Sequence, residues 1–179
     1  MSTIKVKDKE FETFVDAATL DTIVGRLAGE VSRDYRGRSL VVCPVLTGAY
    51  LFAADLLRRL DVEAEVRFVK YSSYEGMGST GKVNCQLPFP ASVAGRDVLI
   101  VEDVVVSGLS MQRLLDEVQA LEPRSVRICA LFYKPSAFKG NYRVDYVGRE
   151  IGNEFIVGYG MDYDEQGRTL PEEYVISGK

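Results

Sequence analysis

One stretch, residues 98–111, constrains the fold of this chain more than any other. It reads Val-Leu-Ile-Val-Glu-Asp-Val-Val-Val-Ser-Gly-Leu-Ser-Met. An apolar run that ends in two adjacent acids, Glu102 and Asp103, predicts a strand buried on both faces, as in a parallel sheet covered by helices. Small residues follow and lead into an amphipathic segment. The stretch therefore predicts a strand, a turn and a helix of an α/β fold.

The turn after this strand has two interpretations. Ser107, Gly108 and Ser110 could offer backbone N–H groups, hydroxyls and a helix dipole to a phosphate, while the paired acids could hold ribose hydroxyls or a hydrated divalent cation. Alternatively, Ser107 simply caps a helix after a buried strand, because most strand-to-helix turns bind nothing. Residues 98–111 alone leave both interpretations open.

Length and charge narrow the class of protein. At 179 residues, the chain fits a single domain, residues 1–179, with a substantial core, and an apolar fraction of 46% argues against disorder. The formal net charge of −4 does not favour a nucleic-acid partner. The first eight residues are too polar for a signal peptide, and no apolar run approaches the roughly 20 residues that span a bilayer.

Histidine and cysteine usage excludes several kinds of site. The chain has no histidine, which removes catalytic triads, general bases and zinc sites that depend on it. Of the three cysteines, Cys43 and Cys129 lie in apolar, strand-like runs. We therefore expect buried reduced thiols rather than disulfides or metal ligands.

Hydrophobic patterning predicts alternating strands and helices, the order of a parallel α/β sheet. The expected helices are residues 16–35, 49–60 and 107–121, and the expected strands are residues 39–45, 63–71, 97–101, 125–133, 142–147 and 154–157. Residues 72–82 form a polar, glycine-bearing stretch expected to be a lid or a hairpin loop.

Chemically suggestive residues follow three of these strands. They are Leu46, Thr47 and Gly48 after the first, the acid pair after the third, and Lys134 after the fourth. Ligands of parallel sheets bind beyond the carboxyl ends of the strands, so all three groups should lie at one edge. Each has an ordinary alternative: Thr47 as a helix cap, and Lys134 as a solvated side chain.

The features of residues 98–111 resemble the ribose-phosphate-binding signature of the type I phosphoribosyltransferases. In that family, a hydrophobic strand, an acid pair and a Thr/Ser-Gly-x-Thr/Ser loop bind 5-phosphoribosyl-1-pyrophosphate. The resemblance implies a parallel sheet flanked by helices, with a small hood built from N- and C-terminal segments. It assigns the ribosyl phosphate to the loop Val106, Ser107, Gly108, Leu109 and Ser110.

The resemblance also assigns roles to residues outside this loop. Glu102 and Asp103 would contact ribose hydroxyls, directly or through Mg²⁺, and the turn Leu46, Thr47 and Gly48 would contact pyrophosphate, its first peptide often being cis. Ser73 and Tyr74 resemble the start of a loop that closes over the site and excludes water. Without the resemblance, that segment would be read as a hairpin loop.

The base-binding end follows from the same resemblance. Lys134 would donate to a purine 6-oxo group, which favours hypoxanthine, guanine or xanthine over adenine. Tyr146 would stack on the base, and the backbone of Val147 would contact the base. Without the resemblance, Tyr146 would be interpreted as an ordinary core residue.

Residues 157–168, Val-Gly-Tyr-Gly-Met-Asp-Tyr-Asp-Glu-Gln-Gly-Arg, are the second match and resemble the hypoxanthine-guanine branch of the family. Asp162 would bind the purine side of the site and ligate Mg²⁺. Arg168, with its forked guanidinium, would bind pyrophosphate. The alternative is an acidic surface turn. Together the matches run from about residue 40 to residue 176, so the implied activity is transfer of phosphoribosyl to a 6-oxopurine.

Val106 departs from the pattern. The hypoxanthine-guanine branch normally has an aspartate here, thought to act on N7 of the purine. Loss of a general base costs about 10² to 10⁴ in rate. The enzyme could be slow, could prefer a more acidic base such as xanthine, or could be a non-catalytic regulator that binds phosphoribosyl pyrophosphate or nucleotide. The orotate and adenine branches also lack this aspartate.

The resemblance implies small-molecule substrates, Mg²⁺ as cofactor and a homo-oligomer, either a dimer or a tetramer. Some relatives are regulators that bind nucleic acid, but the acidic balance of this chain does not favour such a partner. No membrane association is expected, and the expected location is cytoplasmic.

Overall fold

A computed structural model of the chain describes residues 3–73 and 83–177. Its larger sheet has the order β6-β5-β3-β7-β8-β9, with β4 paired to β3. All pairs are parallel except β5 with β6, which is antiparallel. The strands are β3 (Leu40–Leu46), β4 (Ala64–Val66), β5 (Val69–Ser73), β6 (Val83–Leu87), β7 (Asp97–Val105), β8 (Ser125–Tyr133) and β9 (Tyr146–Glu150).

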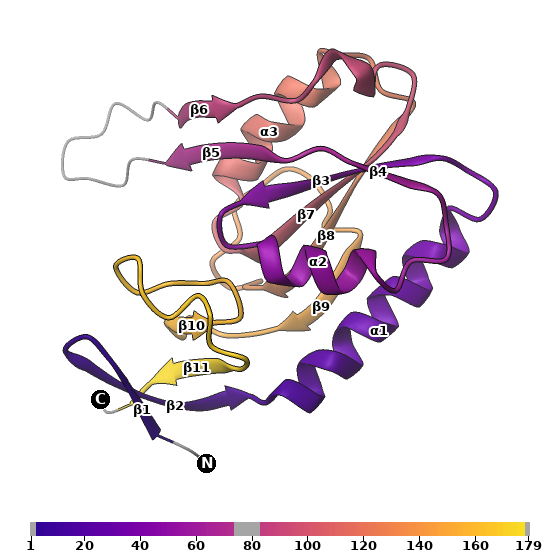
Figure 1. Cartoon of the computed structure of the whole chain (residues 1–179). Helices are drawn as coiled ribbons and strands as arrows, with labels where there is room; N and C mark the ends of the chain where they lie inside the picture. The colour runs from indigo at the N-terminus through magenta and orange to yellow at the C-terminus, as the bar shows by residue number, and fades with distance from the viewer. Residues whose placement is uncertain (1–2, 74–82, 178–179) are drawn as a thin grey trace.

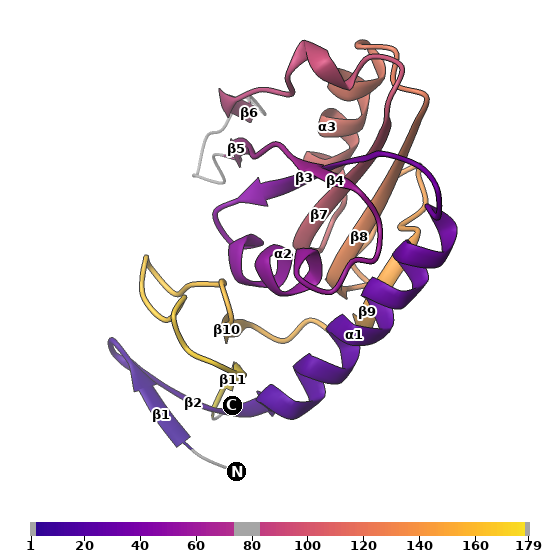
Figure 2. The same ribbon diagram turned by 45° about the vertical axis from the view of Figure 1, so that its right-hand side comes forward.

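Helices cover both faces of this sheet (Figures 1 and 2). Alternate residues of each central strand face opposite sides: Leu99 and Val101 pack with α1 (Ala17–Asp34) and α2 (Tyr50–Leu57), whereas Val98 and Ile100 pack with α3 (Leu109–Gln119). Residues 98–101 are 0% exposed. The prediction of a strand buried on both faces is confirmed.

A second sheet, in the order β1-β2-β11-β10, stands beside the carboxyl ends of the core strands (Figure 1). It consists of β1 (Thr3–Val6), β2 (Lys9–Val15), β10 (Ile156–Gly158) and β11 (Glu173–Ile176). We call this sheet, with residues 154–155 before β10 and the loop of residues 159–172, the hood. Because β2 and β11 come from opposite ends of the chain, the predicted hood of N- and C-terminal segments is confirmed.

Several expected boundaries shift. The strand expected over residues 63–71 is two strands, β4 and β5, which pair with successive parts of β3. The strand expected over residues 142–147 starts only at Tyr146, and β7 runs four residues further than expected, to Val105. The first helix begins after Asp16, whose carboxylate accepts a hydrogen bond from Thr19 N at 2.7 Å.

Residues 91–93 form a short 3-10 helix, η1 (Ala91–Val93), before β7. Within the part of the chain that the structure describes, no helix combines the length and the apolar character needed to cross a bilayer.

Candidate active site

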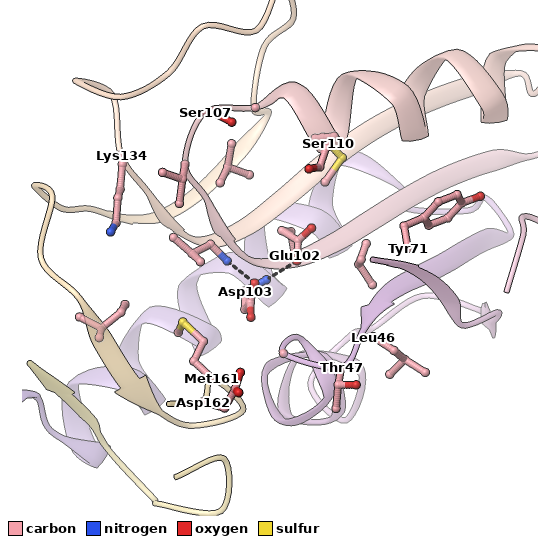
Figure 3. A pocket seen from close by; sticks show the side chains of 18 of the residues that line it. Leu46, Thr47, Tyr71, Glu102, Asp103, Ser107, Ser110, Lys134, Met161 and Asp162 are labelled. Atoms are coloured by element: carbon pink, nitrogen blue, oxygen red, sulfur yellow. Dashed lines mark hydrogen bonds between the residues drawn. The ribbon is translucent and has the colours of Figure 1, made fainter. Parts of the chain in front are cut away.

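A cavity of about 730 Å³ opens between the carboxyl ends of the core strands and the hood (Figure 3). Two sets of residues line it. The core wall comprises residues 45–48 and the lining residues from Glu102 to Leu114. The hood wall comprises Glu154, Phe155, Ile156, Met161, Asp162 and Arg168. Lys134 lies between the two walls, and Tyr71 lines the cavity from β5. The strand ends that were expected to share one edge of the sheet therefore do so.

The turn after β3 packs directly against the acid pair. Its Leu46–Thr47 peptide is cis. Gly48 has no room for a side chain, because a Cβ there would overlap the carboxylate oxygen Oδ2 of Asp103. Thus Leu46, Thr47 and Gly48 line the cavity as expected, with the main chain of Gly48 against Asp103.

Glu102 and Asp103 occupy the floor of the cavity (Figure 3). Asp103 Oδ1 accepts a hydrogen bond from Val104 N at 2.6 Å, and Glu102 Oε1 accepts one from Asp103 N at 3.2 Å. Burial, together with the adjacent Asp103, raises the pKa of Glu102 well above its ordinary value. Burial also raises the pKa of Asp103, while the Arg168 guanidinium acts in the opposite direction. Two half-buried carboxylates side by side favour a bound cation or hydroxyl donors.

The predicted phosphate loop forms a turn at the start of α3. Val106, Ser107, Gly108 and Ser110 line the cavity, and Val106 is 40% exposed. Leu109 is exposed and lies outside the cavity lining, but its N–H faces Ser107 Oγ at 3.4 Å. The helix cap is Gly108, with φ of 77°, rather than Ser107. Glycine adopts this left-handed conformation without the steric cost that other residues bear.

Asp162 and Arg168 come together in the hood loop. Arg168 Nη2 forms an ion pair with Asp162 Oδ1 at 2.9 Å, and its Nη1 donates to Gly160 O at 2.9 Å. A Cβ at Gly160 would overlap the carbonyl oxygen of Gly48, so the hood loop touches the core wall backbone to backbone. Both predicted residues therefore face the cavity opposite the acid pair.

Lys134 is held at the junction of the two walls. Its Nζ donates to the main-chain oxygen of Glu154 at 2.6 Å, and the residue is 9% exposed. Burial lowers the pKa of Lys134, whereas the Glu154 carboxylate raises it. An ammonium group with spare donors in a confined site can recognise an oxo group.

Tyr146 and Val147 do not belong to the site, and their predicted roles are wrong. Tyr146 is 4% exposed in the hydrophobic core, and its hydroxyl donates to Asp34 Oδ2 at 2.8 Å and accepts from Arg127 Nη1 at 2.7 Å. The Val147 carbonyl accepts from Arg26 Nη2 at 3.0 Å. Both lie in β9, away from the cavity lining. The ordinary core interpretation of Tyr146 is the correct one.

Sequence reasoning missed the two aromatic residues that do line the cavity, Tyr71 and Phe155, together with Ile156. Phe155 is 46% exposed although it directly precedes β10. The available signal was its place just before the Val-Gly-Tyr match at residue 157. Two short segments each carried an aromatic residue, and the sequence did not show which one reaches the cavity.

The predicted lid residues are described only in part. Ser73 ends β5, and its backbone pairs with Val83 of β6. Tyr74 lies outside the described residues.

The cavity thus combines a glycine-bearing turn at a helix N-terminus, half-buried carboxylates, a guanidinium, an ammonium and aromatic rings. Nowhere in residues 3–73 and 83–177 do three or more Asp, Glu, Cys or His side chains cluster as a metal cage. Magnesium needs no such cage, because it is commonly held by one or two carboxylates with water and substrate phosphates.

Comparison with known proteins agrees with this geometry. A family model described as the phosphoribosyl transferase domain matches residues 13–164. The hypoxanthine-guanine phosphoribosyltransferase of Mycobacterium tuberculosis (strain ATCC 25618 / H37Rv) is 40% identical over 161 residues, covering 86% of this chain and 80% of that protein. The Staphylococcus aureus (strain Mu50 / ATCC 700699) enzyme of the same name is 34% identical, covering 89% of this chain and 90% of that protein.

A solved structure gives the same result. The crystal structure of a hypoxanthine-guanine phosphoribosyltransferase from Bacillus anthracis, with a HEPES molecule in the active site, superposes with a TM-score of 0.87 at 35% identity. The match covers 93% of this chain and 97% of the Bacillus anthracis chain.

Proposed function

This chain belongs to the phosphoribosyltransferase family, and from that premise we propose how its cavity carries out the reaction. The chain is an enzyme of purine salvage, a hypoxanthine/guanine phosphoribosyltransferase. It transfers phosphoribosyl from 5-phosphoribosyl-1-pyrophosphate to a 6-oxopurine and yields a nucleoside monophosphate and pyrophosphate. The observation that carries the mechanism is the meeting of the anion-binding turn, the acid pair and Lys134 in one cavity.

We propose that the core wall binds the phosphoribosyl group. The 5′-phosphate accepts hydrogen bonds from the backbone and hydroxyls of residues 106–110. Glu102 and Asp103 contact the ribose hydroxyls, and their negative charge stabilises the positive charge that develops on the ribose as pyrophosphate leaves. Residues 46–48 and Arg168 hold the pyrophosphate, to which a forked guanidinium is suited.

The purine occupies the junction of the two walls. Lys134 donates to its 6-oxo group, and the Phe155 ring and the Ile156 backbone contact the base. A lysine ammonium only donates, so this end of the site selects an oxo group over the 6-amino group of adenine. The whole chain, residues 1–179, acts as one domain in this proposal.

Magnesium fits the donors of this cavity. Glu102 and Asp103 are neighbouring, half-buried carboxylates whose pKa values are raised, and a divalent cation would stabilise their charged forms. We propose that these two residues and Asp162 hold Mg²⁺ together with substrate oxygens and water. The ion would supply positive charge to the pyrophosphate leaving group.

The proposal includes a homo-oligomer and a cytoplasmic location. Cys43, Cys85 and Cys129 are free thiols, which suits a reducing compartment. Burial raises the pKa of the Cys43 thiol to about 12, so this side chain stays protonated and unreactive.

One assay tests the proposed function. Nucleotide formation is measured from hypoxanthine, guanine, xanthine, adenine and uracil, each with phosphoribosyl pyrophosphate and Mg²⁺. We expect turnover of 6-oxopurines only. Adenine as the best substrate would contradict the roles of Lys134 and Phe155.

Val106 supports a second candidate, a regulator that binds phosphoribosyl pyrophosphate or nucleotide without turnover. It presents an apolar side chain to the cavity at the one position where the family pattern has a proton-handling aspartate. For an enzyme limited by this residue, Val106→Asp should raise kcat with hypoxanthine by about tenfold or more, because a positioned base contributes about 10² to 10⁴.

Two other outcomes are distinct. Wild-type turnover near 10 s⁻¹, the typical median for enzymes, with no gain from Val106→Asp would show that the aspartate is dispensable in this site. No turnover with any base, combined with tight binding of phosphoribosyl pyrophosphate, would favour the regulator.

A further inference from the structure

The anion-binding turn of residues 106–110 is held from outside the cavity by a segment that follows Lys134. We call residues 135–142 the brace segment. Lys139 N donates to Ser107 O at 2.9 Å, and the Tyr142 hydroxyl donates to Gly108 O at 3.0 Å. None of the brace residues lines the cavity. The brace therefore contacts the turn without touching the space that a ligand occupies.

These two hydrogen bonds restrict the orientation of two consecutive peptide units. The Gly108 oxygen also accepts from Gln112 N of α3 at 2.9 Å, so Tyr142 is its second donor. In a trans peptide, the C=O and N–H groups point in opposite directions. With the carbonyls of Ser107 and Gly108 bound by the brace, the N–H groups of Gly108 and Leu109 are directed away from it. Both N–H groups belong to the N-terminus of α3 and have no main-chain acceptor within the helix; Leu109 N makes only a long contact, 3.4 Å, with Ser107 Oγ. Such donors bind phosphate.

Aromatic packing restricts the same peptides. The rings of Phe138 and Tyr142 meet edge to face with centroids 5.2 Å apart, and Phe138 meets Tyr133 in the same way at 5.3 Å. A Cβ at Gly108 would overlap the Phe138 ring and lie 2.8 Å from the Tyr142 hydroxyl oxygen. Gly140 is equally close, since a Cβ there would lie 2.6 Å from Tyr142 Cε1. The rings occupy the space that side chains at these two glycines would take.

We propose that Tyr142 is a positioning residue for the 5′-phosphate, holding the peptide between Gly108 and Leu109 so that its N–H is ready to donate. The inference rests on the proposed function, because it assumes that residues 106–110 bind the phosphate. A donor fixed before binding adds affinity, since the ligand does not have to order it. Burial and the nearby Glu102 carboxylate raise the pKa of the Tyr142 hydroxyl, which keeps it a donor at neutral pH.

The test compares Tyr142→Phe with a matched control, Tyr146→Phe. Both substitutions remove one tyrosine hydroxyl that is hydrogen-bonded within the protein, but the hydroxyl of Tyr146 contacts Asp34 and Arg127, away from the cavity. For Tyr142→Phe, we expect the KM for phosphoribosyl pyrophosphate and the Kd for inosine 5′-monophosphate to rise about three- to tenfold, the range of one lost hydrogen bond. The KM for hypoxanthine and kcat should stay within about twofold.

A role confined to stability predicts a different pattern. In that case the two variants would unfold at lower urea concentrations and leave both KM values unchanged, and the proposal would be overturned. Equal increases in both KM values of Tyr142→Phe would overturn it as well. Phe138→Leu, which keeps the hydroxyl hydrogen bond, should raise the KM for phosphoribosyl pyrophosphate by a smaller factor, and this variant decides the matter if Tyr142→Phe does not fold.

The proposed function is tested independently of the brace, by the activity of the wild-type protein. A wild-type protein that forms no nucleotide contradicts that function. The brace is then judged by the Kd for inorganic phosphate of wild type, Tyr142→Phe and Tyr146→Phe. Weaker binding by Tyr142→Phe alone would support it, and equal binding would overturn it.

Discussion

The two walls of the cavity are built in different ways. The core wall is made of turns that directly follow β3 and β7, and its glycines, Gly48 and Gly108, pack so closely against neighbouring side chains that neither has room for a Cβ. The hood wall presents side chains, chiefly Asp162, Arg168 and the Phe155 ring, with Lys134 donating to Glu154 at its edge. The core wall should therefore fail when an atom is added, and the hood wall when a charge or donor is removed.

The largest expected effect is at the core wall. Gly48→Ala places a methyl group on the Asp103 carboxylate and must displace the acid or the turn, so kcat/KM should fall at least a hundredfold, as about 1 Å of misplacement costs roughly that much. Gly25→Ala in α1 is the control, because nothing lies within 4 Å of its added Cβ. That variant should keep full activity and gain about 0.5–1 kcal/mol of stability. Full activity of Gly48→Ala would show that the core wall can rearrange to accommodate the added methyl group.

The hood side is tested by removing a donor. Lys134→Ala should lower kcat/KM for hypoxanthine and guanine about 5- to 150-fold, because one lost hydrogen bond to a buried oxygen costs about 1–3 kcal/mol. The Kd for phosphoribosyl pyrophosphate should not change, because Lys134 is assigned to the base and not to that ligand. Lys5→Ala, on an exposed part of β1, controls for the loss of positive charge. An unchanged preference for 6-oxopurines would remove Lys134 from the base site.

Glu173, a buried carboxyl in the hood strand β11, should make the stability of the protein depend on pH. It is 0% exposed, its carboxylate oxygens lack hydrogen-bond partners among the described residues, and burial and Asp103 raise its pKa well above its ordinary value. Between the pKa values of the unfolded and folded states, the folded protein keeps a proton that the unfolded chain has lost. Stability should therefore be greatest below the unfolded-state pKa and fall as pH rises.

Glu173→Gln removes this titration. In urea unfolding between pH 4 and pH 8, the variant should lose about 1–2 kcal/mol less stability than wild type as pH rises. Glu12→Gln, at an exposed position of β2, is the control. Parallel pH curves for wild type and Glu173→Gln would show that this carboxyl is not desolvated.

The smallest expected effect concerns the charge on Lys134 at the edge of the hood wall. Lys134 acts as a donor through its protonated form, and the Glu154 carboxylate opposes the lowering of its pKa by burial. Glu154→Gln should therefore lower that pKa and move the alkaline limb of kcat/KM to lower pH, with a loss of about threefold near pH 9 and little change near pH 7. Glu63→Gln, exposed beside the start of β4, is the control. If the alkaline limb of kcat/KM does not move, Glu154 does not influence the pKa of Lys134.

The same division decided what the sequence could predict. The strands at Leu40–Leu46, Asp97–Val105 and Ser125–Tyr133 leave local patterns, because an apolar run and a following amphipathic helix are adjacent in the chain. Hence the turns of the core wall were located from the sequence; of the residues expected in them, only Leu109 lies outside the cavity lining. Hydrophobic patterning also predicted the parallel α/β sheet, whereas the hood followed from the family resemblance.

Local sequence patterns did not predict the strands of the hood or the aromatic residue beside the base. Strands β1 and β2 are short and half-exposed, and β2 pairs with β11 at the far end of the sequence, so no local period marks them. Tyr146 and Phe155 both sit in short apolar segments with strand-like composition. Only the packing of β9 against α1 shows that Tyr146 faces the core and leaves the cavity to Phe155.

The pairing of β2 with β11 also affects the order in which parts of the protein fold. Thr13 of β2 and Glu172, just before β11, are hydrogen-bonded although they are 159 positions apart. The hood sheet therefore closes a very long loop, and such contacts form late in folding. During synthesis, the core strands from Leu40 to Tyr133 emerge before β11 exists. A nascent chain would thus acquire the phosphate turn before it acquires the wall that selects the base, and substrate selectivity would be the last property of the molecule to mature.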